Sequence, residues 1–169
     1  MEATEVKEAE EFRQFISFSV GEEDYGLELL RVKEVIRMRD ITWLPKAPSF
    51  VKGIINLRGD VIPIIDLRDK FGLESNENTA QTRVIVVELG GRLTGLVVDS
   101  ASQVVRIPTG QIEPPPPVPG GFSQELITGV GKLDDRLIIL LNADSILTVD
   151  EKAALSSIDA APSDERVAP

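Results

Sequence analysis

Residues 51–66 read VKGIINLRGDVIPIID, and this stretch decides the fold. Two runs rich in β-branched residues meet at Arg58-Gly59, and a glycine at so tight a turn is typical of a β-hairpin. The pattern therefore predicts a hairpin over 51–66 with Arg58 at its tip. Arg58 is then either an ordinary solvated turn residue or a recognition arginine that a rigid scaffold presents to a partner.

Short apolar runs separated by turn signals continue on both sides of this hairpin. Residues 15–20 alternate apolar and polar side chains, as a half-buried strand does, and Gly90-Gly91 is typical of a further hairpin. The other predicted strands cover residues 15–20, 25–29, 41–44, 83–89, 93–99, 104–107, 127–132 and 136–141. Helical turns are expected over 29–35 (running into a strand), over 67–71, over 143–147 with Asn142 as cap, and from Asp150 to about Ser157.

Many short strands with turn signals and little helix predict an all-β barrel or sandwich. The strands form two groups of about five, before and after the polar loop near residues 72–82. Two small barrels that divide roughly at this loop are the natural architecture. Residues 1–11 and 158–169 are expected to be flexible tails around an ordered domain over 12–157.

Composition excludes several classes of function. The 169 residues contain neither Cys nor His, so disulfide frameworks, thiolate metal sites and histidine-dependent hydrolysis are excluded. We expect no catalytic residues, no cofactor and no bound metal, although a metal site made of oxygen ligands alone is compatible with this composition. The stiff proline run over 114–117 is expected to be a spacer.

The net charge of −10 lies largely in the tails: residues 1–11 carry five acids and one lysine. This acidity argues against nonspecific binding to nucleic acid or to anionic membranes. The sequence has neither an apolar run long enough for a membrane span nor a secretory signal, so a cytoplasmic location is expected.

Several motifs in order resemble the CheW family of bacterial chemotaxis coupling proteins. They are Tyr25-Gly26-Leu27-Glu28, Val32-Lys33-Glu34-Val35-Ile36, the run from Pro48 to Gly59, the run from Pro63 to Arg68, Gly95-Leu96-Val97-Val98-Asp99, and Ile127-Thr128-Gly129-Val130-Gly131. The resemblance covers about residues 12–157. It implies two intertwined five-stranded SH3-like β-barrels, with chain crossover between them, a few short helices and a C-terminal helix.

The resemblance also implies a function. A protein of this kind is a non-catalytic adaptor that couples the cytoplasmic tips of chemoreceptors to the regulatory domain of the CheA histidine kinase. It would be a monomer alone and part of a large receptor array at the membrane. A CheW-like scaffold of a non-flagellar chemosensory array is the alternative.

Four residues match family positions implied in receptor contact: Val32, Glu34, Arg58 and Val104. Taken alone, Val32 reads as a core residue, Glu34 as a solvated charge and Val104 as part of a core strand. Arg58 and Glu34 could also pair with each other and fix the turn. With the resemblance, the four are expected to form an apolar surface rimmed by charge, on which a receptor helix could lie.

Five glycines are expected to serve turns, bulges or close packing: Gly53, Gly59, Gly95, Gly129 and Gly131. The rival class is an enzyme. Leu96-Val97-Val98-Asp99-Ser100-Ala101 is similar to the aspartic-protease signature, in which Asp99 would be one of two carboxylates in a dimer. No other landmark of those proteases is present.

Overall fold

The computed structural model describes residues 11–73, 78–115 and 125–155. Its strands are β1 (Phe12–Val20), β2 (Glu23–Glu28), β3 (Val32–Arg37), β4 (Val51–Leu57), β5 (Asp60–Asp66), β6 (Arg83–Leu89), β7 (Arg92–Val98), β8 (Ser100–Pro108), β9 (Ile112–Glu113), β10 (Ile127–Leu133) and β11 (Arg136–Leu141). Its helical segments are η1 (Leu29–Arg31), α2 (Leu67–Lys70), η2 (Thr109–Gln111), η3 (Ala143–Ser145) and a last helix over 149–155.

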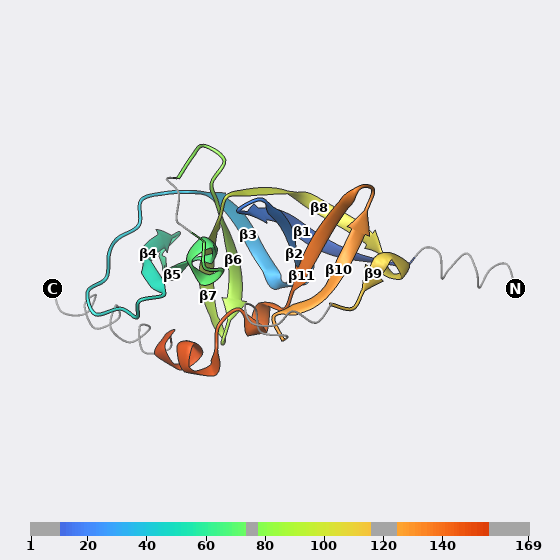
Figure 1. The fold of residues 1–169 in the computed structure, drawn as a ribbon. Helices are drawn as coiled ribbons and strands as arrows, with labels where there is room; N and C mark the ends of the chain where they lie inside the picture. Colours follow the sequence, from blue (N-terminus) through green and yellow to red (C-terminus); the bar gives the residue numbers. More distant parts are fainter. Residues whose placement is uncertain (1–10, 74–77, 116–124, 156–169) are drawn as a thin grey trace, which may run out of the picture.

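The strands form two sheets that lie side by side (Figure 1). One sheet has six strands in the order β8-β1-β2-β11-β10-β9, and the other has five in the order β3-β6-β7-β5-β4. The predicted all-β fold of two SH3-like barrels is confirmed. The six-stranded sheet exceeds the expected five because the two-residue strand β9 pairs with β10.

The loop over 72–82, at which the two barrels were expected to divide, does not separate the two sheets. The loop over 72–82 joins α2 to β6, and β5 and β6 both belong to the five-stranded sheet. The chain instead leaves the six-stranded sheet at η1 and returns to it at β8. This crossing of the chain between the barrels includes the parallel pairing of β2 with β11, a long-range contact that local hydrophobic patterning does not encode.

Three apolar clusters fill this arrangement. One lies inside the five-stranded barrel around Ile62 and Val84, and one lies inside the six-stranded barrel around Phe15 and Ile107. The largest joins the two sheets and includes Phe18, Leu27, Ile65, Ile85, Val87, Leu96 and Val98. Because this shared cluster is made from both sheets, the two barrels pack as one body.

Two local expectations were wrong. Residues 41–44 form no strand: Thr42 makes only a single bridge to Ile54, since Pro45 soon ends any pairing. The last helix is capped by Thr148 rather than Asp150. Its Oγ1 accepts from the Glu151 amide at 3.1 Å while the Thr148 amide donates to Glu151 Oε1 at 2.9 Å, which is a capping box.

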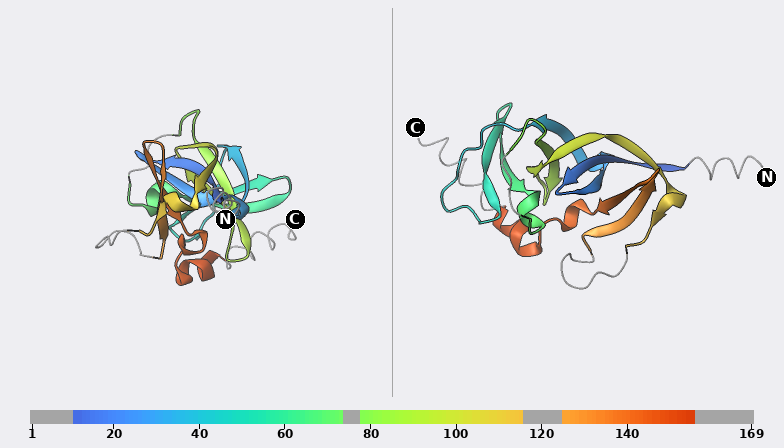
Figure 2. Two further views of the ribbon diagram at one scale, coloured as in Figure 1. Left: turned by 90° about the vertical axis from the view of Figure 1, so that its right-hand side faces the viewer. Right: turned by 45° about the horizontal axis from the view of Figure 1, so that its top comes forward.

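Other expectations hold or lie outside the described residues. The turn over 29–31 runs into β3, and Asn142 Oδ1 accepts from the Asp144 amide at 3.1 Å and so caps η3. The last helix lies beside α2 at one end of the five-stranded sheet (Figure 2), where Lys70 Nζ contacts Glu151 Oε1 at 2.6 Å. Residues 1–10 and 158–169 of the predicted tails, and residues 116 and 117 of the proline run, fall outside the described part of the chain. Within that part, no helix is long and apolar enough to cross a membrane.

Candidate functional site

The β4–β5 hairpin ends in a two-residue turn at Arg58 and Gly59. Leu57 pairs with Asp60 across it, and both turn residues have positive φ, 52° and 94°. Such a turn matches the twist of the flanking strands, but its first position suits Asn or Gly rather than Arg. Arg58 therefore holds a left-handed conformation that side-chain-bearing residues rarely adopt. The predicted hairpin and its arginine tip are both present.

The guanidinium of Arg58 forms a two-point ion pair with Glu34 on β3. Nη1 donates to Oε2 at 3.2 Å, and Nη2 donates to Oε1. The hydrogen bond from Arg58 lowers the pKa of the Glu34 carboxyl from its usual value, and the same bond raises the pKa of Arg58. The Arg58 side chain remains 69% exposed. The alternative in which these residues pair is thus confirmed, and the arginine stays accessible.

Strand β3 presents Glu34 next to a β-bulge. Val32 pairs with Val87 and Glu34 with Val86, so Lys33 is the extra residue. Val32 is half-buried and packs against the cluster that joins the two sheets. It therefore serves partly as core, as its sequence alone suggests.

Sequence reasoning missed Leu30, which is 92% exposed in η1. The Leu29-Leu30 pair held the available signal. In one short turn only one of two adjacent leucines can face the core, and Leu29 packs against the central cluster. Leu29 and Leu30 also line an open pocket of about 230 Å³ with Arg13, Gln14 and Glu28, and Arg13 Nη2 pairs with Glu28 Oε2 at 2.6 Å.

Val104 lies apart from the ion pair in the topology. It sits on β8 of the six-stranded sheet, opposite Ile16 of β1, and is 44% exposed. Of the four predicted site residues, the structure joins Glu34 and Arg58 by direct contact, places Val32 on the same strand as Glu34, and places Val104 on the other sheet.

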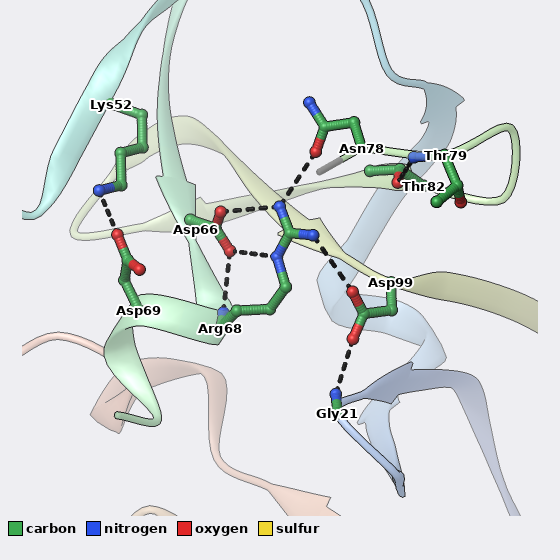
Figure 3. A network of polar contacts seen from close by, with 9 residues as sticks. All are labelled: Gly21, Lys52, Asp66, Arg68, Asp69, Asn78, Thr79, Thr82 and Asp99. Atoms are coloured by element: carbon green, nitrogen blue, oxygen red, sulfur yellow. Dashed lines mark hydrogen bonds and ion pairs between the residues drawn. The ribbon is translucent and has the colours of Figure 1, made fainter. Parts of the chain in front are cut away.

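Asp99 is held in a buried polar network around Arg68 (Figure 3). Arg68 Nη1 donates to Asp99 Oδ1 at 3.2 Å, and the Gly21 amide donates to Asp99 Oδ2 at 2.7 Å. Arg68 also donates two hydrogen bonds to Asp66, from Nε to Oδ1 at 2.9 Å and from Nη2 to Oδ2 at 2.8 Å. A protease aspartate must share a proton with a second carboxylate, whereas both oxygens of Asp99 accept from donors. This geometry assigns Asp99 a structural task.

The five glycines fall into two kinds. Gly59 supplies the turn and has open space around it. A Cβ at Gly53 would lie 2.4 Å from the carbonyl oxygen of Thr42, so the bridge at Thr42 requires glycine there. A Cβ at each of the other three would lie within 3.0 Å of a neighbour; these are Gly95 (Ile64), Gly129 (Glu113) and Gly131 (Ile107).

Among the described residues, no group of His, Cys, Asp and Glu could hold a metal ion. The fold and the surface together define a class: an all-β protein of two fused barrels whose most distinctive exposed feature is an ion-paired hairpin tip. Comparison with known proteins resolves this class to a family.

A family model described as the CheW-like domain matches residues 14–151, and the chain belongs to this CheW family. It is 36% identical over 146 residues to the chemotaxis protein CheW of Klebsiella aerogenes, covering 86% of this chain and 88% of that protein. It is also 36% identical to the Helicobacter pylori chemotaxis protein CheW, with 83% and 85% covered.

A solved structure supports the same assignment. The scaffolding protein TtCheW of Thermoanaerobacter tengcongensis superimposes with a TM-score of 0.75 at 38% identity, over 83% of this chain and 96% of that one. The family is one of chemotaxis adaptor and scaffold proteins and not of enzymes, so the aspartic-protease reading of Asp99 is wrong.

Proposed function

We propose that this protein is a non-catalytic adaptor that couples chemoreceptor cytoplasmic tips to the CheA histidine kinase. Its similarity to relatives named as chemotaxis and scaffolding proteins supports this role. The observation that carries the proposal is the Arg58–Glu34 pair, an accessible charged group on a hairpin held by two strands. The CheW-like domain spans about residues 12–157, and the protein works in the cytoplasm, recruited to receptor arrays.

The receptor-facing surface that we propose comprises Val32, Glu34 and Arg58 of the five-stranded sheet and extends to Val104 of the six-stranded sheet. Leu30, two residues before Val32 in the sequence, is 92% exposed and adds an apolar side chain to this surface. A receptor helix would lay an apolar stripe on these aliphatic groups and meet the charges at their rim. The kinase regulatory domain binds other barrel surfaces, and the free adaptor is a monomer without a cofactor.

The adaptor changes kinase output through geometry. A scaffold that binds one kinase state more tightly shifts the population toward that state, with a coupling free energy on the order of 1–3 kcal/mol.

A scaffold for a non-flagellar chemosensory array is the second candidate. The observation that favours it is a relative named protein FrzA, from Myxococcus xanthus, which is 32% identical over 146 residues and covers 85% of this chain but does not carry the chemotaxis-protein name of the other relatives. Co-purification with receptors from each array type would separate the two candidates.

The decisive experiment is co-purification with a receptor fragment and with the kinase regulatory domain, separately and then together. Arg58→Ala and Leu30→Lys should reduce receptor capture while the thermal melt stays intact. Leu30 is preferable to Val32 for this test, because Val32→Lys would also place a charge against the core.

The matched controls are Arg37→Ala on the exposed side of β3 and Val149→Lys on the last helix, where Val149 is 81% exposed. Both should leave receptor capture unchanged. Capture that is equal for all four variants would refute the proposed surface.

A further inference from the structure

We propose that Asn56 and Arg39 are positioning residues that hold the hairpin tip so that the guanidinium of Arg58 lies against Glu34. The inference deepens the proposed function and rests on it only for the final binding measurement. Asn56 and Arg39 are not themselves proposed to contact the receptor.

The tip needs support beyond its own ion pair. Arg58 occupies a left-handed conformation, and a strained residue persists only where its surroundings over-determine it. The Arg58 side chain is 69% exposed, and an exposed pair between long side chains is weak in water because of screening and lost rotamer freedom. The pair with Glu34 is therefore too weak to be the main restraint on the turn.

Asn56 supplies the first restraint from within the hairpin. Its Oδ1 accepts from the Gly59 amide at 2.8 Å, which closes the turn around Arg58. A side-chain acceptor of this kind satisfies a backbone donor that the tight turn would otherwise leave to water.

Arg39 supplies the second restraint from outside the hairpin. Its Nη1 donates to the carbonyl oxygen of Asn56 at 3.0 Å. Strand β4 is the last strand of its sheet, so Arg39 takes the place that a neighbouring strand would fill at this carbonyl. Arg39 follows β3, the strand that carries Glu34. The Arg39–Asn56 and Arg58–Glu34 contacts therefore join the same two segments.

The test begins with Asn56→Ala, which changes no charge. The charged groups that influence the Glu34 carboxyl are Arg58 and Arg39, and the charge of Asp60 in turn influences Arg58. With the turn loosened, the pKa of Glu34 should rise toward its ordinary value in a carbon-detected NMR titration. The Gly59 amide should lose protection from hydrogen exchange, and receptor-fragment affinity should fall about threefold to tenfold, the effect of ordering one long side chain on binding.

Conservative variants separate positioning from general damage. Asn56→Asp keeps an acceptor, so Gly59 amide protection should return; the titration of Glu34 is not the readout there, because the new carboxylate would alter it. Arg39→Lys keeps the charge but offers a single compact donor, so it should weaken receptor binding less than Asn56→Ala. Arg37→Ala is the control and should change none of these measurements.

An unchanged Glu34 titration and an unchanged Gly59 amide in Asn56→Ala would overturn the inference. If both change while receptor affinity does not, Asn56 does position Arg58, and it is the proposed receptor surface that fails.

Discussion

Among the arginines that form ion pairs with carboxylates, Arg68 and Arg58 differ most clearly in burial. The side chain of Arg68 is 4% exposed and lies between Asp66 and Asp99. The side chain of Arg58 is 69% exposed and forms an ion pair with Glu34. Burial raises the cost of losing a partner, whereas exposure leaves the charge free to exchange one partner for another. The same kind of ion pair therefore stabilises the fold where Arg68 meets Asp66 and Asp99, which we call the lock. It remains available to a partner where Arg58 meets Glu34, which we call the docking pair.

The lock joins segments that lie where the chain passes between the two sheets. Asp66 ends β5, Asp99 precedes β8 where the chain returns to the six-stranded sheet, and Gly21 lies in the β1–β2 turn. Arg68 thus ties the two barrels at their crossing (Figure 3). The docking pair, in contrast, joins β3 to a hairpin of its own sheet.

The largest expected effect is from Arg68→Ala. It leaves the buried Asp66 carboxylate without its guanidinium, and loss of one partner from a buried ion pair costs about 3–5 kcal/mol of unfolding free energy. Urea denaturation measures this. Arg58→Ala is the matched control and should leave the unfolding free energy unchanged within error. Equal losses in the two variants would remove the distinction between lock and docking pair.

Asp99→Asn tests the outer half of the lock and should have a smaller effect. The amide still offers an oxygen to Arg68 or to the Gly21 amide, but it loses the charge. We expect a loss of about 1–2 kcal/mol, the scale of one weakened hydrogen bond to a charged group. Loss as large as that of Arg68→Ala would show that Asp99, and not Asp66, is the essential partner.

The sequence predicted the docking pair better than the lock. The hairpin tip of Arg58 followed from the Arg-Gly turn between two β-branched runs, and its pairing with Glu34 was one of two alternatives. Asp66-Leu67-Arg68 gave no comparable signal. An Asp cap before a helical turn is ordinary, and the network around Arg68 depends on Asp99, 31 residues away, which also accepts from the amide of Gly21 in the β1–β2 turn.

The exchange of strands between the barrels was expected only from the family resemblance, because local sequence patterns do not encode it. Alternation of apolar residues located the long strands, but parallel pairing of β2 with β11 joins segments more than a hundred residues apart. In contrast, the capping box of Thr148 and Glu151 was readable from the sequence. Asp150 has nearly the same capping preference as Thr148 and stands two residues further on.

The pair between Lys70 and Glu151 is intermediate, with side chains 19% and 24% exposed. Burial raises the pKa of Glu151, but hydrogen bonds from Lys70 and the Thr148 amide outweigh this and lower it. A carboxyl with a lowered folded pKa stabilises the fold above its unfolded pKa, and this stability is lost as the pH falls through the folded value.

Glu151→Gln should therefore be less stable than wild type at neutral pH and should converge with it in acid. Thermal melts across this range measure the difference. A gap that stays constant with pH would mean that Glu151 acts through helix capping alone.

The smallest effect on stability should come from Glu34→Gln. The pKa of Glu34 is lowered from 4.5 mainly by the hydrogen bond from Arg58, so its contribution is present above pH 4.5 and fades as the pH falls through the lowered value. Because the pair is exposed, the melt of Glu34→Gln should match wild type at both ends of this range. Receptor capture by wild type should nevertheless weaken in acid, as the carboxylate that orients Arg58 becomes protonated, while capture by Glu34→Gln stays flat. A pH-dependent melt without pH-dependent capture would mean that Arg58 and Glu34 stabilise the fold, as the lock does, and do not bind the receptor.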